Sequence, residues 1–294
     1  MLNMDDFWEL NPISERKLRD NNWILLTGKQ VPIVVDEETH NYFITHNFEH
    51  LKKNINFLDA IKDAGFLKSK SQKVPNLISE NQSKLWVTMR FFALCLGALS
   101  LLFVFYTTLT LGVPTGDKLI SQSLNPLLNV SFIIIFSVLT TLIHEMAHLF
   151  FGQQTLHRRS VLINSKLAVI RVSLSHTWTW TLLGRLTAVS AGVITDLLIL
   201  AILSGLNLVS HSWFLPIACA ILWIRILWQF RLHKRTDGQL LLALIFDMPF
   251  LCQDLKSSKA RYLIFIKFFG VSISLLLIIG WIVPLCIRIY QLFY

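Results

Sequence analysis

Five apolar segments follow one another after Lys84, each close to the ~20 residues that a helix needs to cross a bilayer. They are residues 91–113, 127–151, 186–208, 213–230 and 268–289. Hydrocarbon offers no hydrogen-bond partners to the backbone, so such segments cross a membrane as helices. A sixth apolar stretch, 240–251, is too short to span and is interpreted as a re-entrant, interfacial or buried helix. The sequence therefore predicts an all-α polytopic membrane protein with about five transmembrane helices.

The composition and the charge distribution agree with this prediction. Of 294 residues, 53% are apolar and 15% are charged, whereas soluble domains carry about 25% charged residues. Residues 1–90 are balanced in charge, but residues 91–294 hold 15 basic residues and only six acidic ones. The six acids are Asp117, Glu145, Asp196, Asp237, Asp247 and Asp254. Basic loops beside apolar segments indicate contact with a lipid bilayer, and we expect no nucleic-acid partner.

The loops alternate between rich and poor in basic residues along the chain. The stretch before the first segment and the second and fourth loops are rich, whereas the first loop, the third loop and the C-terminal end are poor. The positive-inside rule then predicts a cytoplasmic N-terminus and a C-terminus outside. Arg225, inside the fourth segment, is the one charge that does not fit this pattern.

Residues 1–84 are predicted to form a small α+β cytoplasmic domain with a linker, ahead of a membrane domain at 85–294. Residues 23–26 and 31–35 favour two short strands around a turn. Acidic residues from Asp36 onward favour a helix start. A second amphipathic helix is predicted at 57–67, and Gly65 is a candidate for its end.

The second apolar segment contains the pattern H-E-x-x-H at residues 144–148. Residues four apart lie on one face of a helix, so His144 and His148 could bind one zinc ion. Glu145 lies beside them and could take a proton from a water molecule that the zinc activates. The alternative interpretation is a polar cluster that joins neighbouring helices.

A catalytic zinc usually has three protein ligands, and the remaining acids are the candidates for the third position. Asp237 fits best, because the second and fourth segments run in the same direction and bring it to the same side as the histidines. Gly238 would allow a close backbone approach there. The alternative is that Asp237 only caps a helix that starts at Gln239. The four cysteines form no CxxC pair that would suggest a thiolate zinc site.

These motifs resemble the site-2 protease family of intramembrane zinc metallopeptidases over residues 91–251. Residues 144–148 are similar to its first motif, 190–196 to its small-residue helix, and Asp237-Gly238 to its second metal motif. Residues 234–241 are closest to the branch of peptide zinc metalloproteases that accompanies bacterial peptide-modification clusters. The resemblance implies one Zn²⁺ held by His144, His148 and Asp237, with Glu145 as general base.

The resemblance also implies a bacterial cell membrane, a small peptide precursor as substrate, and a peptide-modifying enzyme or exporter as a further partner. Residues 1–84 resemble small winged-helix peptide-binding domains, and the alternative is a cytoplasmic domain of another kind. The chain departs from the family at Thr236, where many members have Leu, and at Asp196, where many have Asn. The role of Asp196 stays open between assisting the substrate or oxyanion and bonding a neighbouring helix, for which an ion pair with Arg225 is a candidate.

We expect an intramembrane zinc metalloprotease that hydrolyses a peptide bond. The alternative is a non-catalytic metal-binding membrane component of a peptide export or immunity system. A transporter would predict an internal repeat, and the sequence shows none. His157 and His176 lie in the basic second loop and are interpreted as solvated residues, not as zinc ligands.

Overall fold

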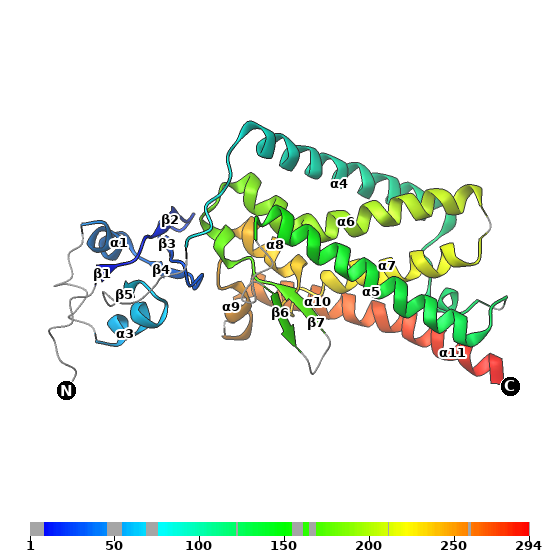
Figure 1. Ribbon diagram of the computed structural model, residues 1–294. Helices are drawn as coiled ribbons and strands as arrows, with labels where there is room; N and C mark the ends of the chain where they lie inside the picture. Colours follow the sequence, from blue (N-terminus) through cyan, green and yellow to red (C-terminus); the bar gives the residue numbers. More distant parts are fainter. Residues whose placement is uncertain are drawn as a thin grey trace. The chain divides into compact units, whose positions relative to one another are not determined.

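The structure is a computed structural model that describes residues 9–45, 55–68, 76–121, 123–154, 161–164, 169–210, 212–257 and 260–293. The chain divides into two compact units (Figure 1). The first unit contains Met1–Ser83 and Gly152–Arg185, and the second contains Lys84–Phe151 and Leu186–Tyr294.

The first unit contains an antiparallel sheet of three strands in the order β2 (Ser14–Lys17), β3 (Trp23–Leu26) and β4 (Ile33–Val35). The hairpin of β3 and β4 was predicted from the sequence and is confirmed, with Trp23 opposite Val35. Strand β2 was not predicted. Its residues, SERK, alternate between half-buried and exposed positions and lack the apolar run that marks β3.

Two helices follow this sheet. Helix α1 (Glu37–Ile44) begins where predicted, and the Asp36 carboxylate accepts a hydrogen bond of 2.8 Å from the Thr39 amide, as an N-cap residue does. Helix α3 (Ile55–Asp63) ends earlier than predicted. Gly65 adopts a positive φ of 83° and turns the chain, so the next residues leave the helix. They lead into β5 (Leu67–Lys68), which pairs with β1 (Glu9–Leu10).

Sheet and helices share one apolar core. Its buried members come from β3, β4, α1, α3 and the approach to β5, and include Leu25, Val35, Phe43, Ile61 and Phe66. The aromatic rings of Phe43 and Phe66 pack edge to face at 5.6 Å. This core makes the small sheet stable, because an isolated hairpin is marginal in water.

The segment 152–185 also belongs to the first unit, although the sequence suggested only a basic loop of the membrane domain. It contains the hairpin of β6 (Val161–Asn164) and β7 (Val169–Val172) and a 3₁₀ turn, η2 (Ser175–Thr179). Two hydrogen bonds of 2.8 Å tie this turn to β2. The Ser14 hydroxyl donates to Thr179 Oγ1, and Arg16 Nε donates to the Trp178 carbonyl.

The second unit is helical and contains four helices that are long and apolar enough to cross a membrane, among the described residues. They are α4 (Lys84–Leu111), α5 (Pro126–Phe151), α6 (Leu182–Val209, whose first turn belongs to the first unit) and the continuous helix Arg261–Gln291. The last consists of α10 (Arg261–Leu277), a π-helical turn, η3 (Ile278–Ile282), and α11 (Val283–Phe293). Pro284 lacks an amide donor, which explains the irregular turn just before it.

The fourth predicted span differs from the expectation. Residues 213–230 contain a helix of only 16 residues, α7 (Phe214–Gln229), which falls outside the four spanning helices. At 1.5 Å per residue it is about 24 Å long, shorter than a hydrocarbon core of ~30 Å. Half of the residues of α7 are buried and only Trp228 is exposed, which allows α7 to pack among its neighbours without full spanning length. The count of five full-length spans is therefore not confirmed.

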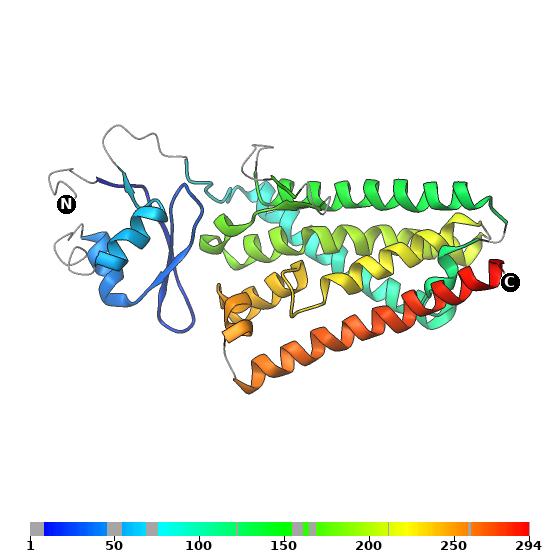
Figure 2. The same ribbon diagram turned by 90° about the horizontal axis from the view of Figure 1, so that it is seen from below.

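Helices α5 and α7 end, and helix α8 begins, at the same end of the second unit. Helix α6 runs in one direction, and α5 and α7 run in the other, toward the end of the unit where α8 (Asp237–Phe246) begins (Figures 1 and 2). The predicted short apolar stretch 240–251 is this ten-residue helix plus the turn into α9 (Leu251–Ser257). The second half of α5 and the first residue of α8 consequently lie close together.

Candidate metal centre

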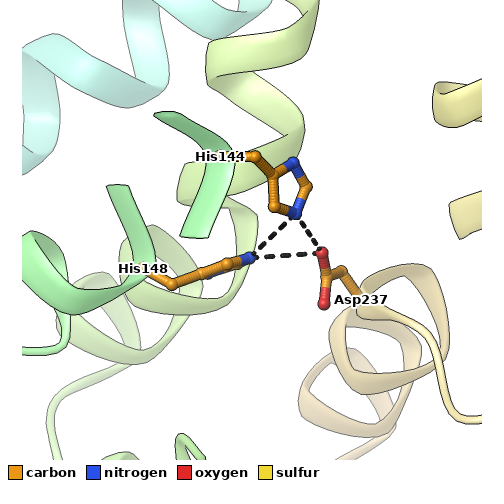
Figure 3. A group of neighbouring side chains, drawn as sticks. All are labelled: His144, His148 and Asp237. Atoms are coloured by element: carbon orange, nitrogen blue, oxygen red, sulfur yellow. Dashed lines mark hydrogen bonds and ion pairs between the residues drawn. The ribbon is translucent and has the colours of Figure 1, made fainter. Parts of the chain in front are cut away.

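Three side chains from α5 and α8 converge on one point of the second unit (Figure 3). His144 and His148 are one helical turn apart on α5, so both imidazoles face the same side. Asp237 is the first residue of α8. Both histidines are buried, and the Asp237 side chain is 21% exposed. The juxtaposition expected from the directions of the second and fourth segments is therefore present.

The facing atoms are the ring Nε2 atoms and one carboxylate oxygen. Asp237 Oδ2 lies 2.9 Å from His144 Nε2 and 3.2 Å from His148 Nε2, and the two Nε2 atoms are 3.3 Å apart. Within the part of the chain that the structure describes, this is the group that could hold a metal ion.

The outward-facing ring nitrogens are hydrogen-bonded to acceptors. His144 Nδ1 lies 2.8 Å from Asp196 Oδ2, and His148 Nδ1 lies 2.8 Å from the Ala188 carbonyl oxygen. A carbonyl and a carboxylate accept hydrogen bonds, so each Nδ1 donates and carries the hydrogen. Each ring thereby directs its Nε2 atom at Asp237, and in the neutral tautomer that atom offers a lone pair to a metal ion.

The donor set and its spacing fit zinc. Two imidazole nitrogens and one carboxylate oxygen are ligands that zinc accepts, at ~2.0–2.2 Å in tetrahedral geometry. Ligand atoms at such distances and angles are separated by ~3.3 Å, and the three separations observed are 2.9, 3.2 and 3.3 Å. The residues present therefore fit a zinc ion without rearrangement of the backbone.

No family model, curated protein or solved structure matches this chain. The assignment of the metal centre therefore depends on the geometry and on the residue types alone.

Two glycines permit the close approach of the backbone at this centre. A Cβ atom on Gly192 of α6 would collide with the Nε2 atoms of both His144 and His148. A Cβ atom on Gly238 would collide with the Gln229 carbonyl oxygen at the end of α7. Glycine at these positions lets α6 pack directly against the imidazoles and lets α8 start beside α7.

The interpretation of Asp237 as only a helix cap is wrong. The N-cap of α8 is Thr236, whose side chain accepts a hydrogen bond from the Gln239 amide. The Thr236 hydroxyl also donates to the Gln229 carbonyl at 2.6 Å. Because Thr236 fills the capping role, the Asp237 carboxylate is available to the histidines.

Glu145, the expected general base, is half-buried on α5 next to His144. Its side chain is not part of the three-residue group. One residue along a helix corresponds to about 100° of rotation, so Glu145 flanks the face that carries the two histidines. Its role remains a proposal.

The ion pair expected as one alternative for Asp196 is present. Asp196, on α6, is fully buried and is paired with the Arg225 guanidinium of α7. Sequence reasoning did not identify its contact with His144, because the two residues are 52 positions apart. The spacing of motifs along the chain gives no information on which face of α6 meets α5.

The interpretation of His176 as a solvated loop residue is wrong. His176 is fully buried in the first unit, where its two ring nitrogens lie 2.9 Å from Gln154 Nε2 and 2.8 Å from the Gly152 carbonyl. Burial lowers the pKa of His176 to about 4. It is not a member of the metal group. His157, Arg158 and Arg159 lie outside the described residues.

Proposed function

We propose that this protein is an intramembrane zinc metalloprotease that hydrolyses a peptide bond of a small peptide precursor or membrane-associated peptide. One observation carries the proposal: the Nε2 atoms of two histidines on a helix long and apolar enough to span a membrane lie within 3.3 Å of each other and of the Asp237 oxygen. The order of motifs supports proteolysis, because H-E-x-x-H with a third ligand is the pattern of zinc peptidases. The peptide substrate is inferred from the family resemblance.

Each residue of the centre has a distinct part in the proposed reaction. His144, His148 and Asp237 would hold the ion, which, when bound, polarises a carbonyl and lowers the pKa of water. Glu145 would accept the proton of the attacking water on a carboxylate oxygen and return it to the leaving amine. The hydrogen bonds from Nδ1 to Asp196 and Ala188 would keep both rings oriented during the reaction.

The proposed location is a bacterial cell membrane, with the N-terminus in the cytoplasm and the C-terminus outside. The alternation of loops rich and poor in basic residues supports this orientation. Helix α7, although short, runs opposite to α6 and returns the chain to the end where α5 finishes (Figure 2). The metal centre would then lie toward the cytoplasmic side of the membrane, and residues 1–84 are proposed to bind the precursor peptide.

The experiment is cleavage of a defined peptide mixture by the full chain purified in detergent and loaded with zinc. Mass spectrometry compares the wild type, Glu145→Gln and the control Met146→Leu, whose side chain is 64% exposed on the next residue of α5. We expect cleavage by the wild type and the control, and a loss of at least ~10²-fold for Glu145→Gln at unchanged zinc content. Equal cleavage by Glu145→Gln would contradict proteolysis by this centre. If all three proteins bind zinc and none of them cleaves a peptide, the result would favour the non-catalytic alternative.

A further inference from the structure

We infer that Asp196 and Arg225 form a support that positions the metal ligand His144. This inference rests on the proposed metal centre but not on peptide hydrolysis. In this arrangement the Asp196 carboxylate fixes the orientation of the His144 ring, and Arg225 fixes the Asp196 carboxylate. Both are positioning residues, because they act on the ion through His144.

Asp196 is bonded to His144 on the side away from the metal centre. Its side chain is fully buried, and Oδ2 lies 2.8 Å from His144 Nδ1. The carboxylate can only accept in this pair, which keeps the hydrogen on Nδ1 and the lone pair on Nε2. An acceptor bonded to the ring nitrogen that does not bind the metal fixes both the tautomer and the orientation of a ligating histidine.

Arg225 holds the same carboxylate with two of its nitrogens. Nε donates to Asp196 Oδ2 at 2.9 Å, and Nη2 donates to Oδ1. The other donors reach α5: Nη1 contacts the hydroxyls of Thr140 at 2.8 Å and Thr141 at 3.2 Å, and Nη2 donates to the Thr140 carbonyl at 2.7 Å. A guanidinium has five N–H donors, and these five bonds use all of them.

The two threonines are oriented to receive the guanidinium. The Thr140 hydroxyl donates to the Phe136 carbonyl at 2.8 Å, and the Thr141 hydroxyl donates to the Ser137 carbonyl at 2.7 Å. Their hydrogens are committed to α5, so their oxygens are available as acceptors. Thr140 lies one helical turn before His144. Arg225 therefore joins the turn of α5 that carries the ligand to the carboxylate that orients it.

The two histidines differ in the support that they receive. His148 Nδ1 has a backbone acceptor, the Ala188 carbonyl, which no side-chain substitution removes. His144 Nδ1 has a charged acceptor that depends on Arg225. Loss of the carboxylate should therefore weaken metal binding through His144 alone. In a His144→Ala background, replacement of Asp196 should have no additional effect on metal affinity.

The test measures the zinc affinity of the metal-free full chain by competition with a chromophoric chelator. Replacement of Asp196 alone would leave the Arg225 charge buried without its partner, so the main variant is Asp196→Leu/Arg225→Met, which removes both charges and the acceptor of His144 Nδ1. The matched control is Ser204→Ala, which removes a different polar contact between α6 and α7, that of Ser204 Oγ with Cys219 Sγ at 3.7 Å. Thermal unfolding without metal and the visible absorption of the Co²⁺ complex are recorded for each protein.

We expect the double variant to bind zinc roughly 10- to 100-fold more weakly, the usual effect of removing the hydrogen-bond partner of a metal-binding histidine. Its Co²⁺ spectrum should change, and its metal-free Tm and all properties of the control should not. Wild-type zinc affinity with an unchanged spectrum would overturn the inference, and so would a loss of affinity that only follows a lower metal-free Tm. Absence of cleavage by the wild type, with zinc affinity still dependent on Asp196, would contradict the proposed protease and leave this inference intact.

Discussion

Substitution of Gly192 by Ala should abolish metal binding without removing a ligand and without unfolding the protein. Gly192 lies on α6 against the imidazoles, and a Cβ atom there would collide with the Nε2 atoms of His144 and His148. To reach ordinary van der Waals distance, both rings would have to retreat by roughly 1 Å. Metal–ligand distances tolerate changes of only ~0.2 Å, so this displacement is incompatible with simultaneous binding by both rings.

The magnitudes separate the effect on metal binding from the effect on stability. Alanine in a helix is more favourable than glycine by ~1 kcal/mol, whereas overpacking of a filled site costs ~1–3 kcal/mol. The free energy of unfolding should therefore fall by about 0–2 kcal/mol. Loss of one hydrogen-bond partner of a metal ligand lowers affinity by up to ~100-fold. Because Gly192→Ala displaces two ligands together, zinc affinity should fall by at least ~100-fold.

The assay is calorimetric titration of the metal-free full chain with zinc, combined with thermal unfolding. The control is Gly205→Ala, about 20 Å further along the same helix, where the new Cβ would lie 3.3–3.4 Å from the Phe103 ring and not against the histidines. The control should bind zinc as the wild type does. If Gly192→Ala also binds zinc with wild-type affinity, the imidazoles do not form the site as described.

Three further predictions concern the metal and the first unit. Zinc at ~1,000 times its Kd should raise the free energy of unfolding by ~4 kcal/mol. A chelator or the substitution His148→Ala should remove this gain in stability. If zinc still stabilises His148→Ala to the same extent, the ion binds elsewhere. Asp36→Ala should destabilise the first unit by ~1 kcal/mol, because α1 loses its N-cap bond to Thr39; circular dichroism during urea unfolding measures this, and no change would refute the capping role. The buried, neutral His176 has a pKa lowered to about 4, so below pH ~6.5 the unfolded chain binds a proton that the folded chain does not, and stability should fall from pH ~6.5 to pH ~4. The slope of Tm against pH over this range should be smaller for His176→Gln than for the wild type. Equal slopes in the two proteins would contradict a buried, neutral His176.

Sequence reasoning succeeded where the determining residues are close together along the chain. The four-residue spacing of His144 and His148 places both rings on one helix face whatever surrounds that helix. The strands at 23–26 and 31–35 and the Asp36 cap depend on similarly local patterns. Asp237 was found because helix direction brings it to the correct end, and because few acids were available as ligands.

The features that sequence reasoning missed depend on contacts between distant residues. The turn near Thr179 joins the first unit through β2, more than 160 residues away in the chain. Thr236 caps α8 instead of Asp237, and the Asp237 carboxylate contacts His144 and His148, which lie about 90 residues earlier in the chain. The limited length of α7 is tolerated because neighbouring helices bury it, and an apolar composition alone does not distinguish burial in protein from burial in lipid.

Elemental analysis of the purified full chain tests the central claim, a metal ion held by His144, His148 and Asp237, most directly. The comparison is between wild type, Asp237→Ala and the control Asp254→Ala, which removes a half-buried acid in α9 that is not part of the metal group. We predict about one zinc per chain in the wild type and the control, and little zinc in Asp237→Ala, because a three-residue site loses a ligand. An unchanged zinc content in Asp237→Ala would contradict the assignment.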